Sequence, residues 1–202
     1  MQSAKLILSV LFENSFRLFR KYALKHKLKQ ESAHRIGLFT LMSIMLKYCY
    51  ELGVKYVSVY AFSVDNFNRK PEEVELPMAL IEEKIEELLM EESIVNTFGV
   101  RIHFIGNLKL LKNSTREAAA RRAMAATAKN DNFVLLICVA YSSTDEIMNA
   151  IQKSYEDKLC KLQESDSGTD QEFAVTLSDV ERHMYMSVTP EPDILIRTLV
   201  FT

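Results

Sequence analysis

The chain has 202 residues, of which 48% are hydrophobic and 26% are charged, and its formal net charge is −2. This composition fits one globular domain with a sizeable core, and the small charge predicts no general attraction to nucleic acid or an anionic membrane. The three cysteines are scattered without a CxxC pair, which argues against a disulfide framework or zinc site and fits a reducing compartment. The five glycines form no P-loop, so side chains and helix amino termini would have to hold any phosphate.

The first 30 residues contain one apolar and one basic segment. Residues 6–12 are too few to span a bilayer, and they fit either a first strand or the start of a helix. No small-residue cleavage site follows them, so we do not expect a signal peptide. Residues 16–29 predict a basic helix, whose charges fit either a solvated face or contact with a diphosphate.

Helix and strand signals alternate from residue 37 to residue 98. Residues 37–52 have helical spacing of apolar side chains, and Gly53 is expected to end that helix. Residues 54–62 predict a strand. Residues 72–98 predict one long helix, which must either start its regular part near Leu76 or bend at Pro77. Its glutamates recur around a solvated face, so we do not assign them to a metal.

The second half continues the alternation. Residues 100–105 predict a strand, 114–129 a helix, and 133–140 a strand buried on both faces. A helix over 144–163 should begin with a capping box formed by Ser143 and Glu146. Residues 164–173 predict a flexible loop, before a short helix and a last strand over 193–198. The pattern predicts an α/β fold in which helices flank a mostly parallel central sheet, within one domain over residues 1–202.

Polar side chains follow the strand over residues 54–62. Ser63, Asn66 and Arg69 would lie at its carboxyl end, the edge where open α/β sheets bind ligands. Asn66 can donate and accept hydrogen bonds, and the Arg69 guanidinium fits phosphate oxygens. The alternative interpretation of this segment is a solvated turn that caps the next helix.

The same segment resembles a known family. The order Tyr-Ala-Phe-Ser-x-x-Asn-Phe-x-Arg over residues 60–69, followed by Pro71, resembles a signature of the cis-prenyltransferases, which include undecaprenyl and dehydrodolichyl diphosphate synthases. Residues 48–56, 106–108 and 193–198 resemble plant and rubber-type members in the same order. The resemblance extends from about residue 20 to residue 198.

The resemblance implies a function and a set of residue roles. The expected reaction condenses isopentenyl diphosphate onto an allylic diphosphate of farnesyl type, with Mg²⁺ as cofactor, and yields a long-chain polyprenyl diphosphate for dolichol or polyprenol biosynthesis. Asn66 would assist proton removal and Ser63 would accompany it. The expected substrate-binding residues are Lys21, His34, Phe67, Arg69 and Arg197. The helix over 72–98 would either wall an apolar tunnel for the growing chain or belong to a plain core.

Purely structural roles for these residues also stay open. His34 could cap a helix or hydrogen-bond locally, and Arg197 could be a surface charge. Lys21 stands at an Arg position of the family, so it keeps the charge but loses the bidentate fork.

Two departures from the family pattern affect the expected activity. Residues 1–19 diverge, and Arg17 stands where the family has its metal-binding Asp, with Glu13 a weak substitute. After Thr198 the family continues with further site residues and a dimer contact, whereas this sequence has four more residues, so the last part of the fold is expected to be missing. The alternative function is therefore a catalytically inactive truncated paralogue, or a subunit of a heteromeric prenyltransferase.

The resemblance also implies partners and a location. A homodimer is expected, or a heteromer with a Nogo-B-receptor-like subunit, and no nucleic acid. The expected location is cytoplasmic, or peripheral on the endoplasmic reticulum membrane.

Overall fold

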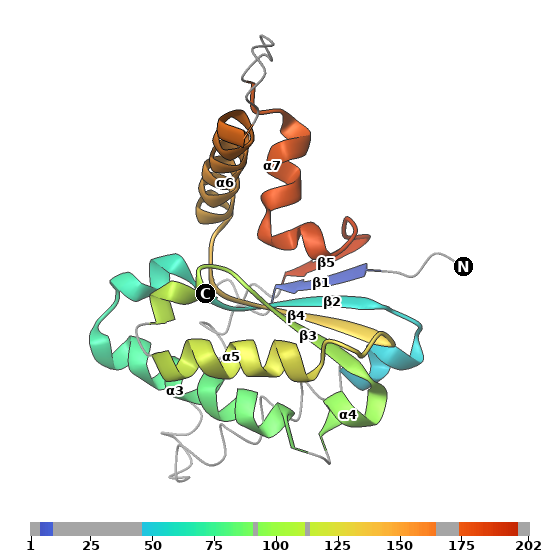
Figure 1. The fold of residues 1–202 in the computed structure, drawn as a ribbon. Helices are drawn as coiled ribbons and strands as arrows, with labels where there is room; N and C mark the ends of the chain where they lie inside the picture. Colours follow the sequence, from blue (N-terminus) through green and yellow to red (C-terminus); the bar gives the residue numbers. More distant parts are fainter. Residues whose placement is uncertain (1–4, 10–45, 91–92, 112–113, 165–173, 198–202) are drawn as a thin grey trace.

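The computed structural model describes residues 5–9, 46–90, 93–111, 114–164 and 174–197. Within them, five strands form one parallel sheet in the order β3-β4-β2-β1-β5 (Figure 1). The strands are β1 (Lys5–Ser9), β2 (Tyr56–Ser63), β3 (Val100–Ile105), β4 (Phe133–Tyr141) and β5 (Ile194–Arg197). The predicted α/β fold with a parallel central sheet is therefore confirmed, and the apolar segment near the amino terminus begins with a strand.

Helices lie on both sides of this sheet. Residues 46–51 are helical, and the longer elements that follow are α3 (Pro71–Leu88), α4 (Ile94–Phe98), α5 (Ser114–Ala126), α6 (Ser143–Glu164) and α7 (Leu177–His183). Short 3₁₀ turns are η1 (Val64–Asn68), η2 (Leu108–Leu111) and η3 (Tyr185–Val188). Helices α3, α4 and α5 cover one face, whereas α6 and α7 stand side by side beyond the other (Figure 1). In the part of the chain described, none of the helices has the length and apolar character needed to cross a bilayer.

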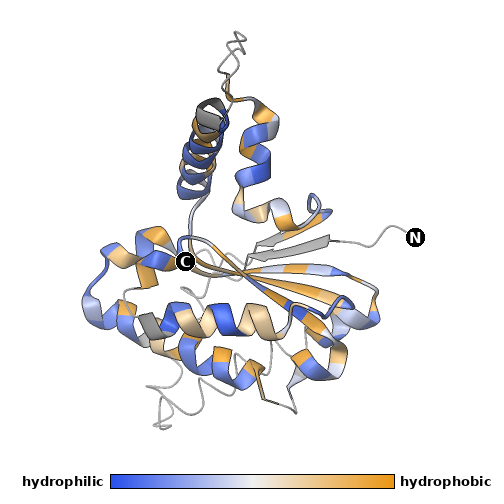
Figure 2. Ribbon diagram, in the orientation of Figure 1, coloured by the Kyte–Doolittle hydropathy of each residue, from blue (hydrophilic) through white to orange (hydrophobic). Residues whose placement is uncertain are grey.

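The sheet separates two apolar clusters of unequal size. The large core lies on the side of α3 and α5, and it includes Val57 and Val59 of β2. The small core lies on the opposite face, where Leu136 and Cys138 of β4 pack with Tyr60. Eight of the nine β4 residues are buried, as predicted for a strand covered on both faces, and Figure 2 shows β4 as largely hydrophobic.

Gly53 ends the helix of residues 46–51 as predicted. Its φ is 74°, in the left-handed region that suits glycine. Its N–H donates to the Tyr50 carbonyl at 3.0 Å, and the Val54 N–H donates to the Cys49 carbonyl at 2.9 Å. These two bonds form a Schellman motif, which turns the chain directly into β2.

The prediction of one helix over residues 72–98 was wrong. Helix α3 ends at Leu88, and α4 begins only at Ile94. Ser93 caps α4, because its hydroxyl accepts from the Asn96 N–H at 3.4 Å, and the Asn96 side chain donates to the Met90 carbonyl at 2.9 Å. These local side-chain bonds stabilise a helix start at Ser93, where an uninterrupted helix was expected.

Of the two alternatives at Pro77, a regular start near Leu76 is excluded. Helix α3 starts at Pro71, whose missing N–H costs nothing in the first turn, and it continues through Pro77. Met78 is buried in the large core, whereas Ala79 is exposed. At Met78 the described residues therefore favour the plain-core interpretation of this helix.

The predicted capping box of Ser143 and Glu146 does not form. The hydroxyl of Ser142 instead accepts from the Asp145 N–H at 3.1 Å, so the cap lies one residue earlier. The Glu146 carboxylate, 2% exposed, accepts from the Tyr141 hydroxyl at 2.6 Å and from the Met186 N–H at 2.8 Å. It therefore joins the end of β4 to η3, 40 residues further along the chain. Glu146 makes these contacts in place of the expected capping contact with Ser143.

Neighbouring tyrosines strengthen this junction. The Tyr185 hydroxyl donates to Asp145 at 3.1 Å, and burial followed by this bond raises the pKa of Tyr185 to about 12. Burial, followed by the bond to Glu146, also raises the pKa of Tyr141 above its ordinary value. Both phenols therefore stay protonated as donors at neutral pH.

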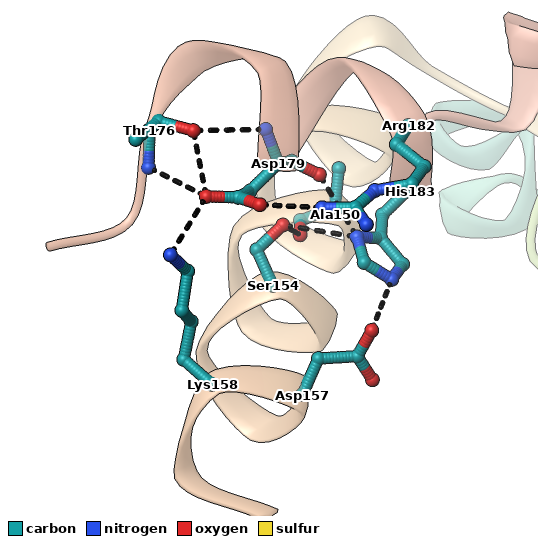
Figure 3. Close-up of polar contacts among 8 residues, drawn as sticks. All are labelled: Ala150, Ser154, Asp157, Lys158, Thr176, Asp179, Arg182 and His183. Atoms are coloured by element: carbon teal, nitrogen blue, oxygen red, sulfur yellow. Dashed lines mark hydrogen bonds and ion pairs between the residues drawn. The ribbon is translucent and has the colours of Figure 1, made fainter. Parts of the chain in front are cut away.

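Polar contacts also hold α7 against α6 (Figure 3). The Asp179 carboxylate accepts from the Thr176 hydroxyl at 2.6 Å and pairs with Lys158 of α6 at 3.4 Å. Hydrogen bonds from Thr176, with a smaller effect of Lys158, lower the pKa of Asp179. His183 reaches the other way, with its Nε2 2.9 Å from the Asp157 carboxylate of α6. The two helices are thus joined by polar contacts in both directions.

An ion-pair cluster joins α5 to α3 on the other side of the sheet. The Arg116 guanidinium donates to Glu82 at 3.1 Å and also bonds Glu75. Its side chain is only 11% exposed, whereas that of Arg121, further along α5, is 63% exposed and, among the described residues, pairs with Glu117.

We expect Arg116→Met to lower the free energy of unfolding by about 1–2 kcal/mol, because two carboxylates lose a partly buried partner. Arg121→Met is the matched control and should cost less than about 0.5 kcal/mol. The hydrogen bond from Arg116 lowers the pKa of Glu75. The stability that this pair contributes is therefore present at neutral pH and is lost as the pH falls through the lowered pKa. Urea denaturation at pH 7 and pH 3 measures the free energy of unfolding of each variant. Equal losses for Arg116→Met and Arg121→Met would contradict the stabilising role of the Arg116 cluster.

Tyr141→Phe should lower the free energy of unfolding by about 1–2 kcal/mol, because it leaves a buried Glu146 oxygen without its donor. Tyr185→Phe is the comparison, and it should cost less, since Asp145 keeps a second donor in Asn107 at 3.3 Å. Chemical denaturation measures both. A larger loss for Tyr185→Phe would show that Glu146 is not the main anchor of η3.

Candidate active site

The turn after β2 carries four of the predicted site residues. Ser63 ends the strand and caps η1, since its hydroxyl accepts from the Asp65 N–H at 3.2 Å. Arg69 closes the same turn, with its N–H donating to the Asn66 carbonyl at 3.2 Å. The solvated-turn interpretation is therefore correct about capping, but the capped element is η1 and not the following helix.

Phe67 holds this turn against the sheet. Its ring lies 5.0 Å from that of Phe62, in an edge-to-face arrangement, and it packs against the large core. Asn66 is half-buried beside it and Arg69 is exposed. This aromatic contact fixes the direction of the turn, and the substrate-binding role of Phe67 stays a prediction.

Arg197 lies at the same edge of the sheet but on another strand. In the parallel register, Leu8 of β1 pairs with Val59 on one side and with Ile196 on the other. The backbone of Arg197 is therefore level with Tyr60, three residues before Ser63. With neighbouring strands about 4.8 Å apart, β5 runs about 10 Å from β2. Such a separation suits groups that contact different parts of one ligand.

Four predicted residues, Glu13, Arg17, Lys21 and His34, lie outside the described residues. Within the described ranges, no group of three or more His, Cys, Asp or Glu side chains is arranged to hold an ion.

Sequence reasoning missed the polar junction on the opposite face. Tyr60 and Tyr141 stand at the same end of neighbouring strands with ring centroids 5.3 Å apart, and Glu146 lies behind them. The sequence signal for this junction was weak: Glu146 is a carboxylate that follows the apolar strand β4. A cavity of about 480 Å³ is also found on this side, and its lining residues are Asn107, Asp145, Met148, Asn149, Ile151, Gln152, Tyr155, Val175 and Tyr185. No predicted site residue lines it.

The groups at the carboxyl edge suit an anionic ligand. A hydroxyl, an amide and a guanidinium occupy one short turn, and a second arginine ends a strand of the same sheet. Guanidinium groups bind phosphate oxygens in a bidentate manner, and an amide can orient a neutral reacting group.

Several known proteins are similar in sequence to most of this chain. The dehydrodolichyl diphosphate synthase 6 of Arabidopsis thaliana is 55% identical over 192 residues, which cover 89% of this chain and 64% of that protein. The rubber cis-polyprenyltransferase HRT2 of Hevea brasiliensis is 45% identical, covering 88% and 65%. The chain thus spans slightly less than two thirds of the length of these relatives.

A solved structure supports the fold. The lavandulyl diphosphate synthase of Lavandula x intermedia, in complex with dimethylallyl diphosphate, superimposes with a TM-score of 0.67 at 22% identity, covering 96% of this chain and 75% of that one. The prenyltransferase family described as "Putative undecaprenyl diphosphate synthase" matches residues 19–199. The chain therefore belongs to the undecaprenyl diphosphate synthase family of prenyltransferases.

Proposed function

We propose that this chain is a cis-prenyltransferase, which condenses isopentenyl diphosphate onto an allylic diphosphate and builds a long-chain polyprenyl diphosphate. The observation that carries the proposal is the short turn from Ser63 to Arg69 at the carboxyl edge of a parallel sheet, in a member of this family. The relatives named as dehydrodolichyl and rubber synthases support polyprenyl diphosphates as the product class.

The proposed reaction needs only a few protein groups. The allylic diphosphate leaves with the bonding electrons, its former carbon bonds to the isopentenyl unit, and a proton leaves that unit. We assign to the Asn66 amide, accompanied by Ser63, the orientation of the isopentenyl unit for proton loss, with the released diphosphate as the proton acceptor. Arg69 and Arg197 would bind the isopentenyl diphosphate. Lys21 and His34 would contact the allylic phosphates. The half-buried position of Asn66 supports this role, because burial strengthens a directed hydrogen bond.

Mg²⁺ is part of the proposal as a partner of the diphosphates, whose leaving charge it would neutralise. The described residues do not provide an ion site of their own, so no step above depends on the metal. Peripheral contact with the cytosolic face of the endoplasmic reticulum also belongs to the proposal, as a location suited to apolar products.

We further propose that the active species is a dimer of this chain, formed through α6. The apolar side chains Ile147, Ile151, Tyr155 and Leu159 are exposed on α6 at spacings of four residues. Such a row forms a ridge that can interdigitate with the same ridge of a second, antiparallel copy, which is the geometry of a two-fold interface. Exposed apolar rows of this length usually mark protein contacts.

Asn66→Ala should lower the rate of chain elongation by about 10²-fold, whereas Arg69→Ala should raise KM for isopentenyl diphosphate by at least about tenfold. The assay uses purified protein with Mg²⁺, farnesyl diphosphate and isopentenyl diphosphate. Lys70→Ala, an exposed cation next to Arg69, is the matched control and should change neither parameter.

Product that is unaffected by both changes would refute the site assignment. Activity that appears only after a Nogo-B-receptor-like protein is added would instead favour the heteromeric subunit.

Ile151→Lys should convert the dimer to a monomer, because it places a charge in the middle of the α6 row. Met90→Lys, which changes an exposed methionine between α3 and α4, is the control and should leave the dimer intact. Sedimentation velocity measures the two masses. A monomeric wild-type protein would contradict the proposed interface.

A further inference from the structure

The pairing of β2 with β4 is irregular just before the candidate site. Tyr60 pairs with Cys138, Phe62 with Val139, and Ser63 with Tyr141. Ala61 therefore has no opposite residue on β4, and Ala140 has none on β2. Each strand carries one extra residue, so the two bulges compensate and the register is the same before and after them.

The paired bulges reverse which face each side chain reaches. In β2, Val57 and Val59 belong to the large core and Tyr60 to the small core, so a regular strand would place Phe62 with Tyr60. Phe62 instead belongs to the large core, one position after the bulge at Ala61.

Strand β4 shows the same reversal. Val139 and Ala140 both belong to the large core, and Tyr141 turns to the small core, where it reaches Glu146.

Ala140 adopts a backbone conformation that alanine rarely takes. Its φ is 52°, and it is the one non-glycine residue in the described ranges with a positive φ. It is fully buried, and its carbonyl accepts from the Asn107 N–H at 2.9 Å. Gly106 leaves room for this bend, because a Cβ there would lie 2.8 Å from the Ala140 oxygen. The end of β3 therefore locks the bulge in β4.

We infer that Ala140 is a positioning residue for the candidate active site, because its left-handed conformation, locked by Gly106, maintains the bulges that turn Phe62 toward the large core. Phe62 is the ring on which Phe67 packs, so the bulge directs the turn that carries Ser63, Asn66 and Arg69. A local backbone strain of this kind persists where the surroundings over-determine it, as at functional sites. The expected change in KM rests on the proposed function, whereas the expected change in the direction of the turn does not.

The test compares two substitutions of Ala140. Ala140→Gly keeps the left-handed conformation and should leave KM for isopentenyl diphosphate within about twofold of wild type. Its relief of strain is offset by the lost methyl group and the freer unfolded chain, so Tm should change by less than about 2 °C. Ala140→Val disfavours that conformation and should raise this KM by about tenfold or more. Ala123→Val, an equally buried alanine of α5 in the same core, controls for overpacking: it should lower Tm but leave KM unchanged.

A second readout does not need turnover. The chain has no tryptophan, so Phe67→Trp introduces a single reporter at the ring that packs on Phe62. Its emission should move to longer wavelength when Ala140→Val is added, and should not move with Ala123→Val. If Ala140→Val does not fold, Gly106→Ala is the second variant: it places a Cβ 2.8 Å from the Ala140 oxygen, so it displaces the same bulge and should give the same red shift.

Unchanged emission and unchanged KM in the folded Ala140→Val or Gly106→Ala protein would overturn the inference. A wild-type protein without activity would refute the proposed function, while the emission measurement would still decide the positioning role.

Discussion

All strands of the described sheet run in the same direction, and the rest of the architecture depends on this constraint. Parallel strands end at one edge, so the carboxyl ends of β2, β4 and β5 lie along it although they are far apart in the chain. Strand β4 makes the arrangement stable, because it is buried on both faces between β3 and β2. Each fully buried Leu or Val of such a strand contributes about 1.5–3 kcal/mol from burial alone. A rigid centre therefore supports polar groups at one edge.

The two faces of the sheet have different tasks. On the side of the large core, the turn after β2 packs through Phe67 and presents Asn66 and Arg69. On the opposite side, Glu146 ties β4 to η3, the segment that leads the chain into β5 and Arg197. A buried carboxylate with two donors is favourable only while both donors stay in place. This junction therefore anchors η3, which precedes the strand that carries the second arginine.

Most of the fold could be predicted because its signals are local. The apolar run of β4, the left-handed Gly53 and the polar turn after β2 each depend on a few neighbouring residues, and all were expected. The break after Leu88 is also local, but the Ser93 cap was hidden within a glutamate-rich helical pattern. The role of Glu146 could not be predicted, because Met186 lies 40 residues away and competes with a plausible local cap. For the candidate site, the sequence predicts the turn and the shared edge, but not the register that sets Arg197 level with Tyr60.

The bulges at Ala61 and Ala140 show why a register matters for function. Glycine at position 140 would adopt the left-handed conformation freely, but it would also have more freedom in the unfolded chain and no methyl group to fill the large core. Alanine keeps the packing and accepts the strained φ, provided that the facing backbone leaves space. Gly106, at the end of β3, supplies that space. The bend at Ala140 therefore depends on a residue of another strand, and no local sequence pattern connects the two positions. The direction of the turn that carries Asn66 is thus set by a pair of small residues 34 positions apart, one of which must lack a side chain so that the other can bend.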